Sequence, residues 1–183
     1  MLITRLVLRN WRNFRSIDVA LSDRVFIVGA NASGKSNFLD ALRFLRDIAK
    51  PGGGLQSSLS LRGGLSKIRC LSARKNPDVE LEITLSEEGG RDSWRYAVAL
   101  TQQAGGLRLP IVKKERAWHD DEMVLDRPDP LDKGDKLLLT QTHLEQISAN
   151  SKFREIAKLL ESIRYFHLVP QLLRRPEIGR AHV

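Results

Sequence analysis

A short glycine-containing stretch limits the possible folds of this chain more than any other feature. Residues 29–37 read GANASGKSN, and residues 29–36 fit the pattern G-x-x-x-x-G-K-[ST] at every fixed position. Four apolar residues, VFIV at 25–28, come directly before it, and an amphipathic stretch follows it. A buried strand, a glycine-rich turn and a helix in this order form a phosphate-binding loop. The sequence therefore predicts an α/β fold built around this loop.

The chemistry of a bound phosphate explains the spacing of the fixed residues. Gly29 and Gly34 permit a tight turn, and the backbone N–H groups of the loop are expected to point inward at the positive end of the helix. Lys35 is expected to reach the β- and γ-phosphates, and the Ser36 hydroxyl to bind Mg²⁺. The sequence thus predicts a nucleoside triphosphate, taken to be ATP, and Mg²⁺ as cofactors. The residues predicted to bind the nucleotide in this stretch are Gly29, Ala30, Asn31, Ala32, Ser33, Gly34, Lys35, Ser36 and Asn37.

Hydrophobic periodicity predicts the elements on either side of the loop. Residues 2–8 and 16–21 alternate apolar and polar side chains, which is typical of a β-hairpin with its turn at 9–15. The continuous apolar run at 25–28 predicts a strand that is covered on both faces. Apolar residues at helical spacing predict a helix over 36–50, which the sequence PGGG then ends.

The second part of the chain changes to a period of two. Residues 79–85, 93–101 and 107–118 alternate, with glycine-containing turns between them, and they predict an antiparallel β-meander. Residues 119–136 are acidic and rich in turn-forming residues, with room for a small hairpin. Helical spacing returns near the end of the chain, in 143–150 and 152–166.

The net charge of +8 is distributed unevenly. Residues 1–75 hold 14 of the 30 Lys and Arg but only 4 of the 22 Asp and Glu. The basic excess therefore surrounds the phosphate loop, which fits a polyanionic partner such as a nucleotide or nucleic acid, or else a solvated basic face. The single cysteine, Cys70, excludes an internal disulfide framework, and no apolar run approaches the length of about 20 residues that spans a bilayer.

Four stretches of the sequence carry a resemblance to a known family. They are LRNWRNFRSIDVAL, VGANASGKSNFLDALRFL, SLRGGLSKIR and RYFHLVPQLLRRP. In this order they resemble the N-terminal half of an ABC-type ATPase head of the RecF/SMC kind. They are most similar to the predicted ATPases of the AAA_15/AAA_21 group, which are relatives of the overcoming-lysogenization-defect (OLD) nucleases. The resemblance implies a P-loop NTPase (ABC-ATPase-like) N-terminal lobe with an antiparallel β-meander and C-terminal helices.

The resemblance also implies two site residues outside the loop. Arg12 occupies the position from which family members reach the nucleotide phosphates, although a plain surface arginine is the competing interpretation. Gln171 is the candidate for the glutamine that senses metal and attacking water in this family, and it is the only glutamine in a suitable late position.

Other parts of an ATP-hydrolysing site are not recognisable in the sequence. In this family a strand ending in Asp-Glu binds Mg²⁺ and orients water, after a serine-glycine signature. MVLDR at 123–127 is a poor match to that strand, and LSLRGG at 59–64 is a poor match to the signature. His143 and His167 are expected to be structural. No Ser/His/Asp arrangement and no metal-ligand spacing is recognisable either.

The expected domain organisation is a partial ATP-binding head over residues 1–177. It divides into hairpin, strand, P-loop and helix (1–50), a mostly antiparallel β segment (51–140) and a helical segment (141–177). Residues 178–183, IGRAHV, correspond to the translation of a common sequencing adapter and are expected to be a non-native tail. The missing catalytic parts are then expected in a longer natural protein.

The function that these features favour is the Mg-ATP-binding head of an SMC/RecF-like ATPase. The resemblance implies that two heads form a homodimer around two nucleotides, that DNA is a partner in repair or phage defence, and that the protein is cytoplasmic with no membrane association. Hydrolysis is expected to require the missing half and dimerisation, so the 183-residue chain is expected to be inactive alone. The alternatives are a small-molecule or nucleotide kinase with the same loop, and a module that binds nucleotide only as a structural ligand.

Overall fold

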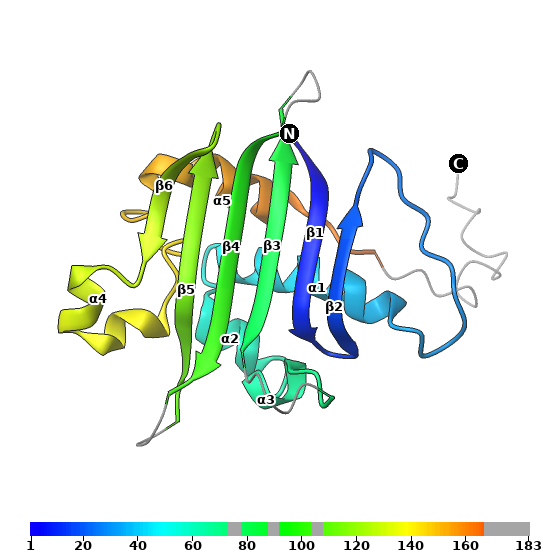
Figure 1. The fold of residues 1–183 in the computed structure, drawn as a ribbon, viewed down its shortest axis with the longest axis horizontal. Coiled ribbons are helices and arrows are strands. Elements are labelled where there is room, and N and C mark those ends of the chain that lie inside the picture. The colour runs from blue at the N-terminus through cyan, green and yellow to red at the C-terminus, as the bar shows by residue number, and fades with distance from the viewer. Residues whose placement is uncertain (73–77, 88–91, 104–107, 167–183) are drawn as a thin grey trace, which may run out of the picture.

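The fold is a single antiparallel sheet with helices packed on one face. The computed structural model describes residues 1–72, 78–87, 92–103 and 108–166. Within these residues six strands form one sheet in the order β2-β1-β3-β4-β5-β6, and α1, α2 and α5 lie behind it (Figure 1). This arrangement bears out the predicted α/β class with an antiparallel meander.

The elements have the following bounds. The strands are β1 (Leu2–Trp11), β2 (Phe14–Ala20), β3 (Val79–Ser86), β4 (Asp92–Gln102), β5 (Pro110–His119) and β6 (Glu122–Arg127). The helices are α1 (Lys35–Ala49), α2 (Leu55–Ser60), α3 (Leu65–Ile68), α4 (Pro130–Gly134) and α5 (Arg154–Ser162), with 3₁₀ helices η1 (Lys136–Thr140) and η2 (Ser151–Phe153). None of the helices in the described part of the chain has both the length and the apolar character needed to cross a bilayer.

The alternation of the strands places one set of side chains in the core. Leu81 and Ile83 of β3 are buried and pair with Val98 and Tyr96 of β4, which are buried too. Because β1 pairs with β3, the N-terminal hairpin and the meander share one sheet. The predicted hairpin and meander are confirmed, and the hydrophobic core lies between this sheet and the helices.

Helix α1 covers the sheet with its apolar face. Phe44, Leu45 and Ile48 are completely buried, and the ring of Phe44 packs 5.3 Å from that of Trp11. On its other side α1 packs against α5, which buries Ile156. The helix predicted over 36–50 is therefore confirmed, and its N-terminus is fixed to the end of the β1–β2 hairpin.

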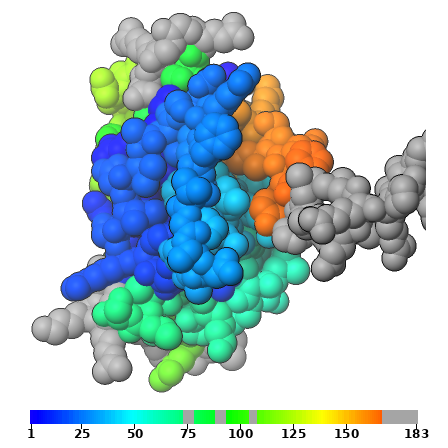
Figure 2. All heavy atoms as spheres, turned by 90° about the vertical axis from the view of Figure 1, so that its right-hand side faces the viewer, coloured from blue at the N-terminus to red at the C-terminus, as the bar shows by residue number. Residues whose placement is uncertain are grey.

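The strand predicted at 25–28 is wrong. This segment has no regular secondary structure, and it pairs with no strand of the described residues. The side chains of Phe26 and Val28 are 90% and 92% exposed, and those of Val25 and Ile27 are 47% and 38% exposed. The run has the composition of a doubly covered strand, but a strand forms only where a neighbouring strand satisfies its backbone groups. Figure 2 shows residues 20–33 lying across the outside of the molecule, in front of α1.

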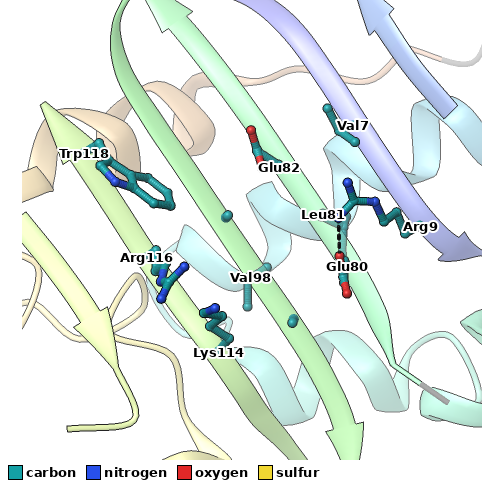
Figure 3. A pocket seen from close by; sticks show the side chains of 11 residues that line it. Val7, Arg9, Glu80, Leu81, Glu82, Val98, Lys114, Arg116 and Trp118 are labelled. Atoms are coloured by element: carbon teal, nitrogen blue, oxygen red, sulfur yellow. Dashed lines mark hydrogen bonds and ion pairs between the residues drawn. The ribbon is translucent and has the colours of Figure 1, made fainter. Parts of the chain in front are cut away.

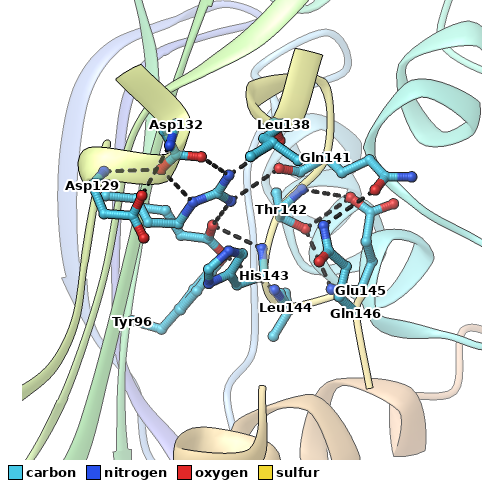
Figure 4. Close-up of polar contacts among 12 residues, drawn as sticks. Tyr96, Asp129, Asp132, Leu138, Gln141, Thr142, His143, Leu144, Glu145 and Gln146 are labelled. Atoms are coloured by element: carbon cyan, nitrogen blue, oxygen red, sulfur yellow. Dashed lines mark hydrogen bonds and ion pairs between the residues drawn. The ribbon is translucent and has the colours of Figure 1, made fainter. Parts of the chain in front are cut away.

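The helix predicted at 143–150 is also wrong, since this segment forms turns; it begins beside a buried charge cluster (Figure 4). The Glu115 carboxylate accepts hydrogen bonds from the backbone N–H groups of His143 (2.8 Å) and Leu144 (3.1 Å) and from the Tyr96 hydroxyl (2.9 Å). Arg127, which is 1% exposed, donates to Glu115 (2.9 Å) and Asp132 (2.6 Å). Further along, the side chains of Asn150 and Arg154 donate to the carbonyls of Leu144 (3.1 Å) and Ile147 (2.6 Å), which in a helix would accept backbone N–H groups.

Candidate functional site

The phosphate loop connects the segment at 25–28 to the start of α1. Gly34 is the residue before the helix and has φ of 109°, in the left-handed region that favours glycine. A β-carbon at this position would lie 2.5 Å from Nδ2 of Asn13 and 2.8 Å from Cζ of Phe14. Glycine is therefore required here both for the backbone conformation and for the close approach of the hairpin.

The N-terminus of α1 presents free backbone donors. Among the described residues, the N–H groups of Gly34, Lys35 and Ser36 donate to no carbonyl and to no side chain. Helix α1 has 15 residues, so the positive end of its dipole lies at these groups. Free N–H groups at the positive end of a helix fit a phosphate group.

The two side chains predicted to contact the nucleotide and its metal lie at the same end. Lys35 Nζ donates to the carbonyl oxygens of Gly29 (2.7 Å) and Ala30 (2.8 Å), so its ammonium group is held against the loop. The Ser36 side chain is exposed, and within the described chain its hydroxyl has no hydrogen-bond partner. A cation, a free hydroxyl and free N–H groups are the donor set that a phosphate with Mg²⁺ requires.

The tip of the β1–β2 hairpin contacts the loop directly. Asn13 Nδ2 donates to the Ser33 carbonyl (3.2 Å), and Asn13 Oδ1 accepts from Asn37 Nδ2 (2.8 Å). Trp11 Nε1 donates to the Asn37 carbonyl (2.7 Å). The role of Asn13 was missed in the sequence, because nothing in the hairpin pattern distinguishes an asparagine in a turn from one that binds a loop about twenty residues later.

Arg12 lies next to these contacts, with its side chain directed along α1. Its guanidinium donates to Asp40 (3.0 Å) and to the Lys67 carbonyl (3.3 Å). Its backbone N–H donates to the Ile68 carbonyl (2.6 Å), and its φ is 53°. The structure places Arg12 beside the loop helix in an ion pair, and its role as a phosphate ligand stays a prediction.

A cleft of about 670 Å³ opens beside the loop between the hairpin tip and α3. Three basic residues line it: Arg12, Lys67 and Arg69. The other lining residues are Asn13, Asn37, Ser66, Cys70, Leu71 and Ser72. Asn37, in the first turn of α1, also lines this cleft, so the basic side chains of the cleft lie next to the phosphate loop.

A network of ion pairs connects α1 to the turn after α2. Arg62, with a side chain that is 6% exposed, binds Asp40 (3.0 Å) and Asp47 (3.1 Å). Burial alone raises the pKa of Asp47, but hydrogen bonds from Arg46 and Arg62 outweigh it, so the pKa lies below its usual value. Asp40 therefore joins Arg12 to a buried structural network.

The described residues do not complete a hydrolytic centre. No group of three or more His, Cys, Asp or Glu among them could hold a metal ion. Asp126, the acid of the weak match at 123–127, lies on β6 and pairs with Arg116 at 2.7 Å. His143 contributes to the buried cluster around Glu115, and Gln171 and His167 lie outside the described residues.

A second cavity, of about 300 Å³, lies on the solvent face of the sheet (Figure 3). Glu80 and Glu82 of β3 stand on one side, and Lys114 and Arg116 of β5 on the other. Arg9 pairs with Glu80 at 2.8 Å. None of the loop residues lines this cavity, so it is separate from the candidate site.

Comparison with known proteins gives a match over most of the chain. Residues 24–170 match the family described as "AAA domain, putative AbiEii toxin, Type IV TA system". The chain is 34% identical over 94 residues to a DNA replication and repair protein RecF from Synechocystis, which covers 50% of this chain and 24% of that protein. It is 28% identical over 120 residues to RecF from Geobacillus, covering 63% of this chain and 32% of the relative.

Two further similarities are shorter or weaker. Endonuclease GajA from Bacillus cereus is 43% identical over 47 residues, which cover 26% of this chain and 8% of the relative. An SMC ATPase structure covers 96% of this chain and 93% of its own, with a TM-score of 0.47 at 14% identity, too slight a likeness to bear on function. The chain spans about a quarter of the length of the RecF from Synechocystis, at 24%.

Proposed function

Because the chain belongs to this AAA domain family, we propose that its phosphate loop, residues 29–37, binds ATP together with Mg²⁺. The observation that carries the proposal is the set of free N–H groups at the start of α1, with Lys35 held against the loop. A helix N-terminus of this kind stabilises negative charge, and a lysine at this position adds a point charge for the β- and γ-phosphates.

Each loop residue has a separate part in this proposal. The backbone from Gly29 to Ser36 surrounds the phosphates, and Lys35 exchanges its bonds to the loop carbonyls for bonds to the nucleotide. Ser36 supplies a hydroxyl oxygen to Mg²⁺, which neutralises phosphate charge when it is bound. Arg12 is a candidate second cation, provided that it leaves Asp40.

We infer that ATP hydrolysis requires protein beyond this chain. Water attack needs an acid that holds Mg²⁺ and a residue that orients the water. Asp40, the acid that follows the loop in sequence, is already paired with Arg12 and Arg62. The exposed run at 25–28 supports the same inference, because no strand among the described residues pairs with this apolar segment next to the loop. Pairing of two heads around the nucleotides is part of this proposal.

DNA is the polyanion that we propose as partner, in repair or phage defence. The relatives in the comparison are DNA replication and repair proteins and an endonuclease. The basic side chains Lys67 and Arg69, in the cleft beside the loop, give the chain a surface for phosphate groups. The kinase alternative is disfavoured, because β3–β6 form an antiparallel meander where a kinase continues with alternating strands and helices.

Calorimetric titration with Mg-ATP tests the binding proposal. The intact chain is expected to bind, and Lys35→Ala is expected to weaken binding by at least about tenfold through loss of a charged hydrogen bond. Lys158→Ala removes a lysine of α5 that only pairs with Glu155 and serves as the matched control. Equal affinities of the intact chain and Lys35→Ala would overturn the proposal, and rapid ATP hydrolysis by the isolated monomer would overturn the inference of an incomplete site.

A further inference from the structure

We propose that Asn13, at the tip of the β1–β2 hairpin, is a positioning residue that holds the phosphate loop in its binding conformation. The inference deepens the proposed function and rests on it. Asn13 uses both ends of its amide: the nitrogen donates to the Ser33 carbonyl at 3.2 Å and the oxygen accepts from the Asn37 side chain at 2.8 Å. It therefore connects the last turn of the loop to the first turn of α1.

The hairpin tip is itself fixed firmly to the rest of the fold. Trp11 is completely buried, packs against Phe44 and donates to the Asn37 carbonyl at 2.7 Å. Backbone bonds join Arg12 to the Ile68 carbonyl at 2.6 Å and Cys70 to the Asn10 carbonyl at 2.9 Å. A side chain on such a tip has a defined position, so it can hold a neighbouring segment that has fewer bonds of its own.

Apart from the bonds of Lys35 Nζ to the Gly29 and Ala30 carbonyls, the loop has few other restraints in the described structure. The segment before it, residues 22–28, forms no backbone pairing with the described strands. Within the loop, one backbone bond runs from Ser33 N–H to the Ala30 carbonyl at 3.3 Å, which is at the long end for such bonds. Helix α1 restrains the C-terminal end of the loop, and Asn13 restrains it from the hairpin through the Ser33 carbonyl.

The chemistry of the amide explains why this position needs asparagine. An aspartate offers no donor to the Ser33 carbonyl, and its charge would oppose a phosphate at the nearby N-terminus of α1. The space is equally restricted, since a β-carbon at Gly34 would meet Asn13 Nδ2 at 2.5 Å. The Asn13 side chain thus fits beside the loop only because residue 34 has no side chain.

The test compares Asn13→Ala, Asn37→Ala and the double variant, with Ser16→Ala as control. Ser16 is an exposed residue of β2 on the same hairpin and makes no contact with the loop. Hydrogen exchange of the Ser33 and Phe38 amides, which donate to the Ala30 and Gly34 carbonyls, is measured without nucleotide. It is expected to speed up at least about tenfold in Asn13→Ala, as loss of the two Asn13 hydrogen bonds predicts. Affinity for Mg-ATP is expected to fall by a similar factor, with the thermal midpoint almost unchanged because Asn13 is exposed.

The double variant distinguishes a shared positioning role of Asn13 and Asn37 from two independent effects on the loop. Asn13→Ala removes both contacts and Asn37→Ala only the second, so the double variant is expected to lose no more affinity or protection than Asn13→Ala alone. Additive losses, or normal loop protection in Asn13→Ala, would overturn the inference. Should Asn13→Ala fold poorly, Asn37→Ala tests the same contact from the helix side. If the intact chain does not bind Mg-ATP, the proposed function fails, whereas loop exchange still decides the role of Asn13.

Discussion

Two segments of this chain were predicted to be strands, and only one of them is a strand in the structure. Val79–Ser86 forms β3, with strands on both sides, and its side chains Leu81, Ile83 and Leu85 are buried. The run VFIV at 25–28 is apolar at every position and leads into the phosphate loop, but Phe26 is 90% exposed. The difference shows that apolar sequence becomes a strand only when backbone partners are present. In the meander, which we call the complete side, β3, β4 and β5 each have a neighbouring strand on both sides. The segment before the phosphate loop, which we call the open side, is exposed and pairs with no described strand.

The largest expected effect lies on the complete side, in the buried charge cluster. Glu115→Ala removes the acceptor shared by Tyr96, His143 and Arg127 and leaves buried donors unsatisfied. We expect a loss of about 4 kcal/mol in the free energy of unfolding. Urea denaturation followed by circular dichroism measures it. Glu122→Ala, at an exposed acid of β6, is the control, and an equal effect of both changes would contradict a special role for the cluster.

The comparison is tested most directly by truncating one apolar side chain in each segment. Leu81→Ala leaves a cavity between the sheet and the helices and is expected to cost about 3 kcal/mol of unfolding free energy. Val28→Ala is expected to change it by less than about 0.5 kcal/mol, because the side chain is already 92% exposed. Equal losses in the same denaturation experiment would show that the segment at 25–28 is buried in solution.

Low pH is expected to lower the free energy of unfolding by protonating Asp132, in the buried charge cluster of the complete side. Burial alone raises the pKa of Asp132, but hydrogen bonds from Arg127 and from the Asp129 N–H outweigh it and leave the pKa below its usual value. Such a carboxylate stabilises the fold above its unfolded pKa, near 4, and this contribution disappears as the pH falls through the lower folded pKa. Unfolding free energies between pH 7 and pH 3 should therefore fall less steeply in Asp132→Asn than in the intact chain. Parallel curves would exclude Asp132 as the cause.

The smallest effect on stability is expected from Phe26→Ser on the open side. The exposed ring contributes little to the core, so the unfolding free energy should stay within about 0.5 kcal/mol. An exposed apolar segment with unpaired backbone groups favours association between molecules. Light scattering at increasing concentration should therefore show less self-association in the variant. Unchanged scattering would mean that the segment does not cause association.

Periodicity in the sequence was sufficient for the regions whose contacts repeat along the chain. The hairpin, α1 and the strands of the meander follow patterns of two or of 3.6 residues, and each was predicted, although β1 and β2 extend into the turn expected at 9–15. Prediction failed where a distant partner decides the outcome. The run at 25–28 has the composition of a buried strand, but no strand of the described residues pairs with it.

The candidate site shows the same division. The loop motif identified the residues from Gly29 to Asn37, because phosphate chemistry fixes their spacing. The contact of Asn13 with Ser33 and the pairing of Arg12 with Asp40 depend on how the hairpin packs on α1, which no local pattern contains. Contacts between the loop and a residue of another element can be identified only from the three-dimensional structure.

The place of β1 in the sheet has a consequence for how the chain emerges from the ribosome. Arg9 of β1 contacts Glu80 of β3, 71 residues later in the sequence. The phosphate loop and α1 are synthesised between the two strands, at a time when β1 has only β2 as a neighbour. Pairing over such a separation forms late, because a long loop must close first. The sheet under the phosphate loop is therefore complete only after translation has passed β3, and shorter nascent chains expose the loop on an unfinished sheet.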